Sequence, residues 1–257
     1  MVISSTNAST KQHTLRPAPM TTRPHFIIAL VSLTLTLTIA PLHADEPRCF
    51  TTDQLDPVAV LPPPPAPGSA EEAADLSTPV AVHKACNPDD LAAAKSQQRF
   101  NVYVFTPVIG PFFQRDTLLA TQTFIHRVHN TTEDIQNAAK TAFHRPRPYV
   151  LDPGLADGQP ENNYSYPSGH ACQGTVYALI LADLFPDKRD DILALGRAIG
   201  WHRVQFAKHF PTDVYAGRVL AQAIYRQLKT SPDYQRDLAA AKAELTHAAP
   251  QPAPIAR

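Results

Sequence analysis

Three short stretches of the sequence carry residue types that could bind and transfer a phosphoryl group. The first, KTAFHRPRP over residues 140–148, places Lys140 and Arg147 seven positions apart with Arg145 between them. The planar fork of arginine and the point charge of lysine are the usual protein partners of phosphate. Taken alone, the stretch is also explained by a solvated basic turn.

The second stretch is PSGH, residues 167–170. If a helix begins at Pro167, the amides of Ser168, Gly169 and His170 have no intrahelical acceptor and lie at the positive end of the helix dipole. Such an end binds anions. Glycine lets an oxyanion approach the backbone, serine adds a hydroxyl donor, and histidine can protonate a leaving group. The alternative is a helix cap followed by an unrelated histidine.

The third stretch is HRVQFAKHFPTD, residues 202–213, in which Arg203, His209 and Asp213 stand at spacings of six and four. His209 precedes a helix predicted from Pro211, and Asp213 lies in its first turn. The carboxylate can therefore accept a hydrogen bond from one imidazole nitrogen and leave the lone pair of the other facing a pocket. An imidazole held in this way is a nucleophile or a base. The alternative is a structural pair that caps the helix.

Together, the three stretches predict in-line phosphoryl transfer that requires no metal ion and no cofactor. His209 attacks phosphorus and forms a phosphohistidine, and His170 protonates the leaving oxygen and then activates water. Fixed cations take the place of Mg²⁺ in offsetting charge on the equatorial oxygens. The predicted catalytic residues are His209, His170 and Asp213, and the predicted phosphate-binding residues are Lys140, Arg147, Ser168, Gly169 and Arg203.

This pattern resembles the three-part signature of the type-2 phosphatidic acid phosphatase superfamily. Within it, YSYPSGH, DVYAGR and the LPPPP segment are most similar to bacterial class A non-specific acid phosphatases, and the resemblance is strong over residues 140–218. It implies an all-helical fold, periplasmic secretion, no metal requirement, a phosphohistidine intermediate and broad phosphomonoester specificity. The eight residues assigned above coincide with positions of the family motif.

One position departs from the family pattern. The family usually has a small residue, often serine, before the arginine of the third motif, whereas this chain has His202. We expect His202 to play a supporting or structural role, and His144 to line the mouth of the pocket. Asn163, Tyr164 and Tyr166 could shape the side of the pocket that receives the leaving group.

Several other functions share this site chemistry. A lipid phosphate or pyrophosphate phosphatase would use the same residues, although members of that branch are normally embedded in the membrane. A vanadate-dependent haloperoxidase would share the pocket, and a non-catalytic phosphate-binding protein would need no polarised histidine. A zinc site built from His202, His209 and Asp213 lacks an evident fourth ligand.

Proline and capping signals predict that helices position the three stretches. Asn87 is a predicted N-cap ahead of Pro88, and Thr131 or Thr132 is a predicted N-cap for a helix that begins near Asn130. Further helices are expected to begin at Pro167, Pro186 and Pro211. Because no alternating strand pattern or Asn-Gly hairpin appears, the fold class is predicted to be all-α, with one compact helical domain.

The first 44 residues resemble an export signal. An apolar run of fifteen residues, FIIALVSLTLTLTIA, follows basic residues and precedes a small residue, Ala44, at a suitable cleavage point. The run is shorter than the roughly 20 residues that span a bilayer. Met20 is an alternative start of translation. We therefore predict a signal peptide over 1–44, an extended proline-rich segment over 45–70, a helical phosphatase domain over 71–247 and a disordered tail over 248–257, in a periplasmic or secreted protein.

Charge and cysteine content limit the partners. The formal net charge of the 257 residues is zero, and the first 44 residues contribute Lys11, Arg16 and Arg23 but no acid, so the remainder is mildly acidic. Such a balance argues against nucleic-acid binding. The predicted partners are small phosphate esters, without stable membrane insertion, and a homo-oligomer is compatible with the sequence.

The three cysteines leave the redox state open. Cys49 and Cys86 could form a disulfide or remain free. Cys172, two residues after the second stretch, is expected to be a small buried hydrophobic residue.

Overall fold

The computed structural model describes residues 47–250 and consists of helices joined by turns. The predicted signal peptide and tail residues 251–257 lie outside the described residues. The α-helices are α1 (Pro57–Val60), α2 (Ala70–Ala85), α3 (Pro88–Ser96), α4 (Thr106–Ile109), α5 (Leu119–Phe143), α6 (Pro148–Leu151), α7 (Gly169–Leu184), α8 (Arg189–Gln205), α9 (Pro211–Leu228) and α10 (Pro232–Ala248). No strand occurs within residues 47–250, so the all-α prediction is confirmed there.

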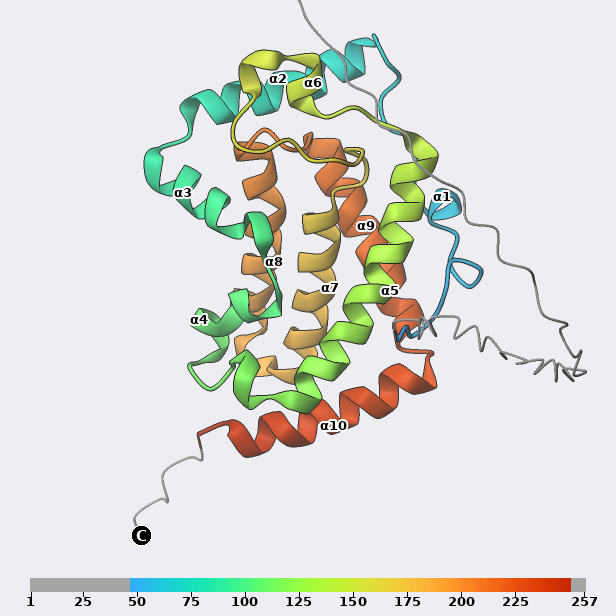
Figure 1. Ribbon diagram of the computed structural model, residues 1–257, viewed down its shortest axis with the longest axis vertical. Coiled ribbons are helices and arrows are strands. Elements are labelled where there is room, and N and C mark those ends of the chain that lie inside the picture. The colour runs from blue at the N-terminus through green and yellow to red at the C-terminus, as the bar shows by residue number, and fades with distance from the viewer. Residues whose placement is uncertain (1–46, 251–257) are drawn as a thin grey trace, which may run out of the picture. The chain divides into compact units, whose positions relative to one another are not determined.

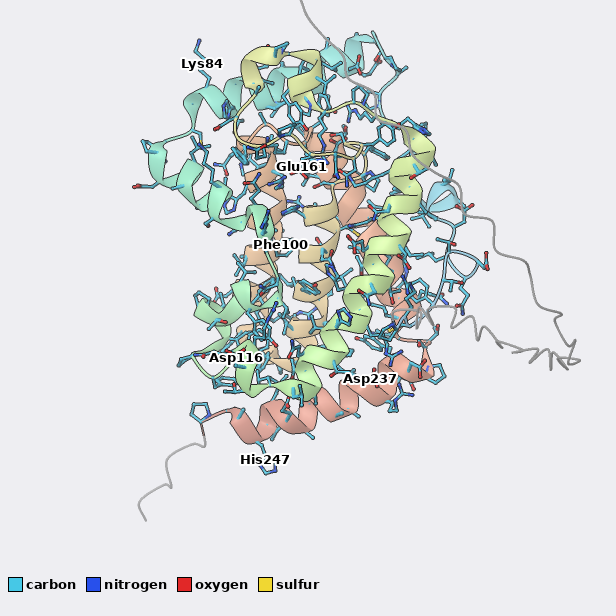
Figure 2. All side chains as sticks on the ribbon, viewed as in Figure 1. Lys84, Phe100, Asp116, Glu161, Asp237 and His247 are labelled. Carbon is cyan, nitrogen blue, oxygen red and sulfur yellow. The ribbon has the colours of Figure 1, made fainter. Side chains whose placement is uncertain are left out.

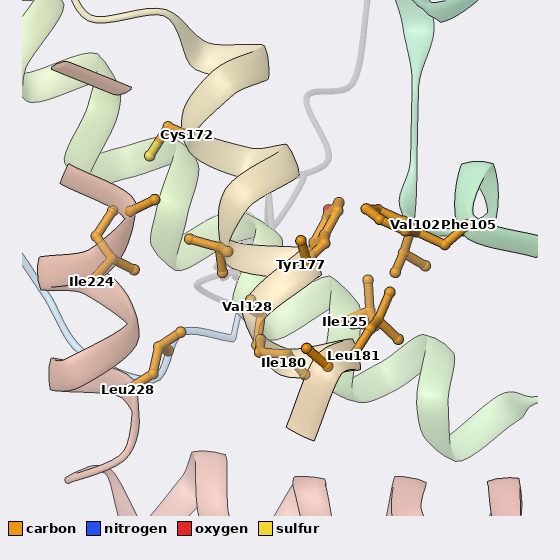
Figure 3. Close-up of a cluster of buried hydrophobic side chains, with 14 of the residues drawn as sticks. Val102, Phe105, Ile125, Val128, Cys172, Tyr177, Ile180, Leu181, Ile224 and Leu228 are labelled. Atoms are coloured by element: carbon orange, nitrogen blue, oxygen red, sulfur yellow. The ribbon is translucent and has the colours of Figure 1, made fainter. Parts of the chain in front are cut away.

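Helix α7 lies at the centre, beside α5, α8 and α9 (Figure 1). Its sequence, GHACQGTVYALILADL, is apolar on almost every face, as a helix surrounded by other helices requires. Close approach of α9 depends on Gly217, because a Cβ there would lie only 2.5 Å from the Ser168 carbonyl oxygen. Figure 3 shows part of the resulting apolar core, with Val128 of α5, Ile180 of α7 and Ile224 of α9 among the buried side chains.

Helix α5 begins much earlier than the sequence indicated. Thr131 and Thr132 are interior residues, not N-caps, and their hydroxyls donate to the carbonyls of Arg127 and Val128 at 2.8 Å. Threonine can bond backward in this way within a helix, so its presence does not fix a helix start. The preceding turns stay helical because their apolar face is buried against the core, for example at Phe124.

The N-terminus of α5 is capped from α10, a helix that the sequence analysis did not anticipate. The Glu244 carboxylate accepts hydrogen bonds from the amides of Ala120 and Thr121 at 2.9 and 2.8 Å. These are amides that the helix itself leaves without acceptors. Helix α10 therefore lies across the end of the bundle opposite the N-terminus of α7 (Figure 1).

The segment before α2 is largely non-helical but contains the short helix α1. It is attached to the bundle through polar contacts, since the Tyr166 hydroxyl donates to the Pro62 carbonyl at 2.6 Å and the Cys49 amide donates to the Thr131 hydroxyl at 2.9 Å. All three cysteines are free thiols, so the Cys49–Cys86 disulfide does not form, and Cys172 is fully buried as expected.

Candidate active site

A pocket of about 200 Å³ opens at the N-terminal end of α7. Five of the eight predicted site residues line it: Lys140, Arg147, Gly169, His170 and His209. The other three, Ser168, Arg203 and Asp213, are fully buried beneath this lining. The structure thus gathers residues from all three sequence stretches at one place.

His209 is positioned by a tight turn between α8 and α9. Ala207 adopts a left-handed conformation (φ 49°), which ends α8. The amides of Lys208 and His209 then both donate to the Arg203 carbonyl, at 2.9 and 3.2 Å. A left-handed residue just after a helix is a common way to satisfy its last carbonyls. Here it also brings His209 back beside the helix that carries Arg203.

The two ring nitrogens of His209 have different partners. Nδ1 lies 3.2 Å from Oδ2 of Asp213, and Nε2 lies 3.2 Å from Nη1 of Arg147. A carboxylate accepts and a guanidinium donates, so Nδ1 carries the hydrogen and Nε2 presents its lone pair. Burial, then the positive charges of Arg147 and Lys140, lower the pKa of His209 well below 6.5. The ring is therefore neutral, as a nucleophile requires.

The Asp213 carboxylate is held by donors besides His209. It accepts hydrogen bonds from the Phe210 amide at 2.9 Å, the Ser165 hydroxyl at 2.5 Å and Nη1 of Arg145 at 2.6 Å. Burial raises the pKa of Asp213, and these donors oppose that effect. The guanidinium of Arg145 therefore supports the carboxylate and is not one of the cations that line the pocket.

Arg145 has a second carboxylate partner on α2. Its Nη2 donates to Oδ2 of Asp75 at 2.8 Å, and both side chains are almost completely buried. The Thr212 hydroxyl also donates to the Asp75 carboxylate. A chain of ionic contacts thus runs from Asp75 through Arg145 and Asp213 to His209.

Three cations surround the pocket. Lys140 lies in the last turn of α5, where its Nζ donates to the Tyr164 carbonyl at 2.5 Å. Burial, followed by the nearby charge of Arg147, lowers the pKa of Lys140 to about 7. Arg147 is oriented by the carbonyls of Asn163 and Lys208, at 3.0 and 2.8 Å.

Arg203 is the deepest of the three cations. Its Nη2 donates to the carboxylate of Glu161, while Nε and Nη1 are buried without a hydrogen-bond partner. Buried donors without partners are rare in proteins, and those of a charged group are the most costly. Arg203 is therefore able to donate further hydrogen bonds to an anion in this region.

The PSGH turn differs in one respect from the sequence expectation. Helix α7 begins at Gly169 and Ser168 is its N-cap, so the helix starts two residues after Pro167. The Ser168 amide donates to the Asp213 carbonyl at 2.9 Å and is not available to a ligand. Its hydroxyl lies 3.4 Å from the Ala171 amide, in the geometry of a cap. The first-turn amides left for an anion are those of Gly169 and His170.

Gly169 packs closely against a side chain of α5. A Cβ at this position would lie 3.1 Å from Nε2 of Gln136, one turn before Lys140. Gln136 also lines the pocket, and its Oε1 is buried without a partner. The helical spacing of four between Gln136 and Lys140 is a signal from which sequence reasoning could have found it.

His170 is oriented by backbone carbonyls. Its Nε2 lies 3.1 Å from the Gln97 oxygen and 3.2 Å from the Gln98 oxygen. Since carbonyls only accept, Nε2 carries a hydrogen and Nδ1 is the nitrogen left to exchange a proton. In the empty pocket, burial and then the charge of Arg203 lower the pKa of His170 to about 3. The ring of Phe100 packs beside it, with centroids 5.0 Å apart.

Glu161 is the most important residue that sequence reasoning missed. It lines the pocket, pairs with Arg203, and approaches Nη2 of Arg147 to 4.0 Å. Figure 2 labels it at the end of the bundle where α7 begins. It lies in an irregular loop, so no periodicity in the sequence marks it. Ser165 was missed for the same reason. Asp75 lies on α2 and was missed because its partner Arg145 is distant in sequence.

The remaining candidate residues have structural contacts. Nδ1 of His202 lies 2.7 Å from Oε1 of Gln97. His144 caps α5 in a left-handed conformation and packs edge-on against Tyr164, with ring centroids 4.6 Å apart. His144 is exposed and does not belong to the pocket lining, so the prediction that it lines the mouth is wrong. Tyr166 is buried and faces Pro62, whereas Asn163 lines the pocket.

Residues 47–250 contain no group of three or more His, Cys, Asp or Glu side chains arranged to hold a metal ion. Over the same range, every helix is too short or too polar to cross a lipid bilayer.

Comparisons with known proteins agree with this geometry. The profile of the PAP2 superfamily matches residues 119–236. The chain is 30% identical over 218 residues to the acid phosphatase of Zymomonas mobilis, covering 81% of this chain and 83% of that protein. It is 28% identical over 205 residues to the non-specific acid phosphatase of Providencia stuartii, covering 74% and 81%.

Among solved structures, the chain is similar to the transmembrane PAP2 type phosphatidylglycerolphosphate phosphatase from Bacillus subtilis. The TM-score is 0.44 and the sequence identity is 22%, over 64% of this chain and 87% of the other.

Proposed function

The chain belongs to the PAP2 superfamily and is a phosphoric monoester hydrolase, and from this premise we propose that it is an exported acid phosphatase of broad specificity that acts through a phosphohistidine on His209. The observation that carries the proposal is the pairing of His209 with Asp213. It leaves a neutral Nε2 lone pair facing a pocket lined by cations. A site that only binds phosphate has no need of such a nucleophile.

In the first step, Nε2 of His209 attacks phosphorus, forming a P–N bond as the P–O bond to the leaving group breaks. Asp213 stabilises the positive charge that develops on the ring through Nδ1. His170 donates a proton to the departing oxygen. Although the pKa of His170 is about 3 in the empty pocket, the negative charge of a bound ester raises it, so His170 takes up its proton together with the substrate.

In the second step, the now neutral His170 removes a proton from a water molecule. The water oxygen attacks phosphorus, the P–N bond breaks, and inorganic phosphate is released with His209 restored. During both steps Lys140, Arg147 and Arg203 offset charge on the equatorial oxygens, with the Gly169 amide as a further donor. This set of fixed charges supports the proposal of metal-independent catalysis.

The outer part of the pocket supports polar leaving groups. Beyond the phosphate position, its lining is rich in side-chain amides and charged groups with a single aromatic ring: Gln98, Arg99, Phe100, His129, Glu133, Gln136 and Gln173. Such a wall suits sugars and nucleosides, because its side-chain amides and charged groups offer hydrogen bonds to them. We infer that small, water-soluble phosphate monoesters are the substrates.

Export is part of the proposal and is supported by the sequence of the first 44 residues. Cleavage after Ala44 would release the helical domain outside the cytoplasm. A periplasmic or extracellular location also agrees with substrates that are polar and cannot cross a membrane.

The proposal is tested by trapping the phosphoenzyme. We expect the mature protein to hydrolyse p-nitrophenyl phosphate in the presence of EDTA. Quenching the reaction in alkaline denaturant should recover a phosphorylated protein that resists alkali and is labile to acid. His209→Ala should neither hydrolyse p-nitrophenyl phosphate nor yield a phosphorylated protein. His247→Ala, at an exposed histidine on α10, is the matched control and should behave as wild type.

Activity that disappears with EDTA would contradict metal independence. Full activity in His209→Ala would remove His209 from the role of nucleophile. A panel of nucleotides, sugar phosphates, lipid phosphates and pyrophosphates then ranks the substrates. A marked preference for a lipid phosphate would contradict the assignment of polar leaving groups.

A further inference from the structure

A carboxylate lies among the cations of the phosphate pocket. Glu161 forms a hydrogen-bonded ion pair with Nη2 of Arg203, and its second oxygen lies 4.0 Å from Nη2 of Arg147. Arg203 has no other hydrogen-bonded partner for its side chain among the described residues. In the empty pocket, Glu161 is thus the anion that neutralises the deepest cation of the site.

Glu161 reaches these cations from the solvent side. Its side chain is 26% exposed, whereas the side chains of Arg203 and Arg147 are 1% and 4% exposed. The backbone of Glu161 is anchored separately, because its amide donates to the Tyr149 hydroxyl at 2.9 Å. The side chain can therefore turn toward solvent without movement of the loop that carries it.

A bound phosphoryl group and an ionised Glu161 would both lie against the guanidinium groups of Arg203 and Arg147. Nε and Nη1 of Arg203 remain able to donate to the anion, so the two anions compete through their charge and not for the same donors. Two anions within a few ångströms of each other repel strongly in a buried site, so one must lose its charge or leave. Arg147 already donates to three backbone carbonyls, to the Asn163 side chain and to His209.

We propose that Glu161 is an internal competitor of phosphate, whose carboxylate pairs with Arg203 close to Arg147 and must leave these cations before the anion binds fully. The inference rests on the proposed function, because it takes Arg203 and Arg147 to be ligands of the phosphoryl group. Its consequence is weaker retention of inorganic phosphate, which favours release of the product.

The competition depends on the charge of Glu161. The charged or titratable groups that face its carboxylate are Arg203, Arg147, Lys140, His170 and Lys208. Burial raises the pKa of Glu161, but Arg203 and Arg147 outweigh it and hold the pKa below its ordinary value of 4.5. The competitor is thus charged near neutral pH, and competition is lost as the pH falls through the lowered pKa.

If Glu161 merely positioned Arg203, its removal would change the affinity for phosphate in the opposite direction. If Glu161 only held Arg203 in place, its removal would loosen that side chain and weaken phosphate binding. If Glu161 competes, its removal frees the cation and strengthens phosphate binding. The affinity for inorganic phosphate therefore separates the two roles.

The experiment titrates inorganic phosphate into the mature wild-type protein, Glu161→Gln and Glu71→Gln by calorimetry. Glu71 is an exposed acid in the first turn of α2 and is not part of the pocket lining, so its variant controls for a general change of charge. At about pH 6 we expect Glu161→Gln to bind phosphate about tenfold more tightly than wild type, which corresponds to about one charged hydrogen bond. Glu71→Gln should differ from wild type by less than about twofold, because its exposed charge is screened by solvent.

The pH dependence gives a second readout. The ratio of wild-type to Glu161→Gln dissociation constants should fall toward one as the pH is lowered from about 6 through the lowered pKa of the Glu161 carboxyl. Comparison at each pH removes the titration of phosphate itself. Glu161→Ala serves as a second variant, and melting temperatures without phosphate establish that each variant is folded.

Equal or weaker binding of phosphate by both Glu161 variants overturns this inference alone. Equal strengthening by Glu71→Gln overturns it as well, because the effect would then come from net charge. Failure of all three proteins to bind phosphate overturns the proposed function, and this inference with it.

Discussion

The contact between Asp75 and Arg145 should stabilise the fold more than it assists catalysis. Asp75 belongs to α2, far in sequence from the three motifs, yet its carboxylate is the second partner of the arginine that holds Asp213. Asp75→Asn keeps the shape and one acceptor oxygen but removes the charge. The variant therefore tests how much of the active site depends on a residue outside the motifs.

The expected loss of stability in Asp75→Asn depends on the carboxylate partner that Arg145 retains. Breaking a buried pair and leaving a charge alone costs about 3–5 kcal/mol, but Arg145 still pairs with Asp213 in this variant, so this figure is an upper bound. The loss is closer to that of one charge-assisted hydrogen bond, about 2 kcal/mol. For a domain of this size each kcal/mol lowers Tm by about 2–4 °C, which gives a decrease of about 4–8 °C.

The catalytic effect should be smaller. Asp75→Asn leaves the bond between His209 and Asp213 in place, so we expect kcat to fall less than about tenfold, the equivalent of about 1.4 kcal/mol in the barrier. Asp213→Asn should instead lower kcat by at least about 100-fold, because an amide can hold His209 in the wrong tautomer.

The assay combines thermal melts with steady-state hydrolysis of p-nitrophenyl phosphate. Glu71→Gln, at an exposed acid on the same helix, is the control and should change neither Tm nor kcat. An unchanged Tm in Asp75→Asn would refute the claim that the buried contact stabilises the fold. A loss of kcat as large as that of Asp213→Asn would refute the separation of stability from catalysis.

Two further predictions concern Lys140 and Gly217. The pKa of Lys140 in the empty pocket is about 7, so its positive charge is present below that pH and lost above it. Phosphate affinity relative to Lys140→Met should therefore decrease as the pH rises through 7, and a ratio that stays constant from about pH 6 to about pH 8 would contradict this. Gly217→Ala would place a Cβ 2.5 Å from the Ser168 carbonyl and force α7 and α9 apart, so urea unfolding should show a loss of about 1–3 kcal/mol; an unchanged midpoint would contradict the close approach.

The site residues could be predicted from the sequence where local backbone structure brings them together. His209 and Asp213 are four residues apart across a helix start marked by Pro211, so local backbone structure brings them together. Lys140 likewise lies near a helix end that the following prolines impose. The all-α class followed from repeated proline and capping signals combined with the absence of strand patterns.

The remaining features depend on tertiary packing. Thr131 and Thr132 are of a residue type that is favoured at N-caps, but burial of the surrounding helix face determines where α5 begins. Glu161 and Asp75 pair with arginines that are distant in sequence. No periodic pattern in the sequence identifies either position. Ser168 could be identified from its motif, yet its action as a helix cap depends on where α7 begins.

The two histidines receive different roles because their hydrogen-bond partners differ. In His209, a carboxylate fixes the hydrogen on Nδ1 and offsets the charge that forms when Nε2 attacks. In His170, two neutral carbonyls orient Nε2 without offsetting a full charge, so protonation depends on the anion that enters the pocket. A ring whose positive charge is stabilised in advance suits the nucleophile, and a ring that gains its proton with the substrate suits the general acid. Exchanging the two roles would leave the attacking ring without a counter-charge, which is why the assignment follows from the partners and not from the order of the motifs.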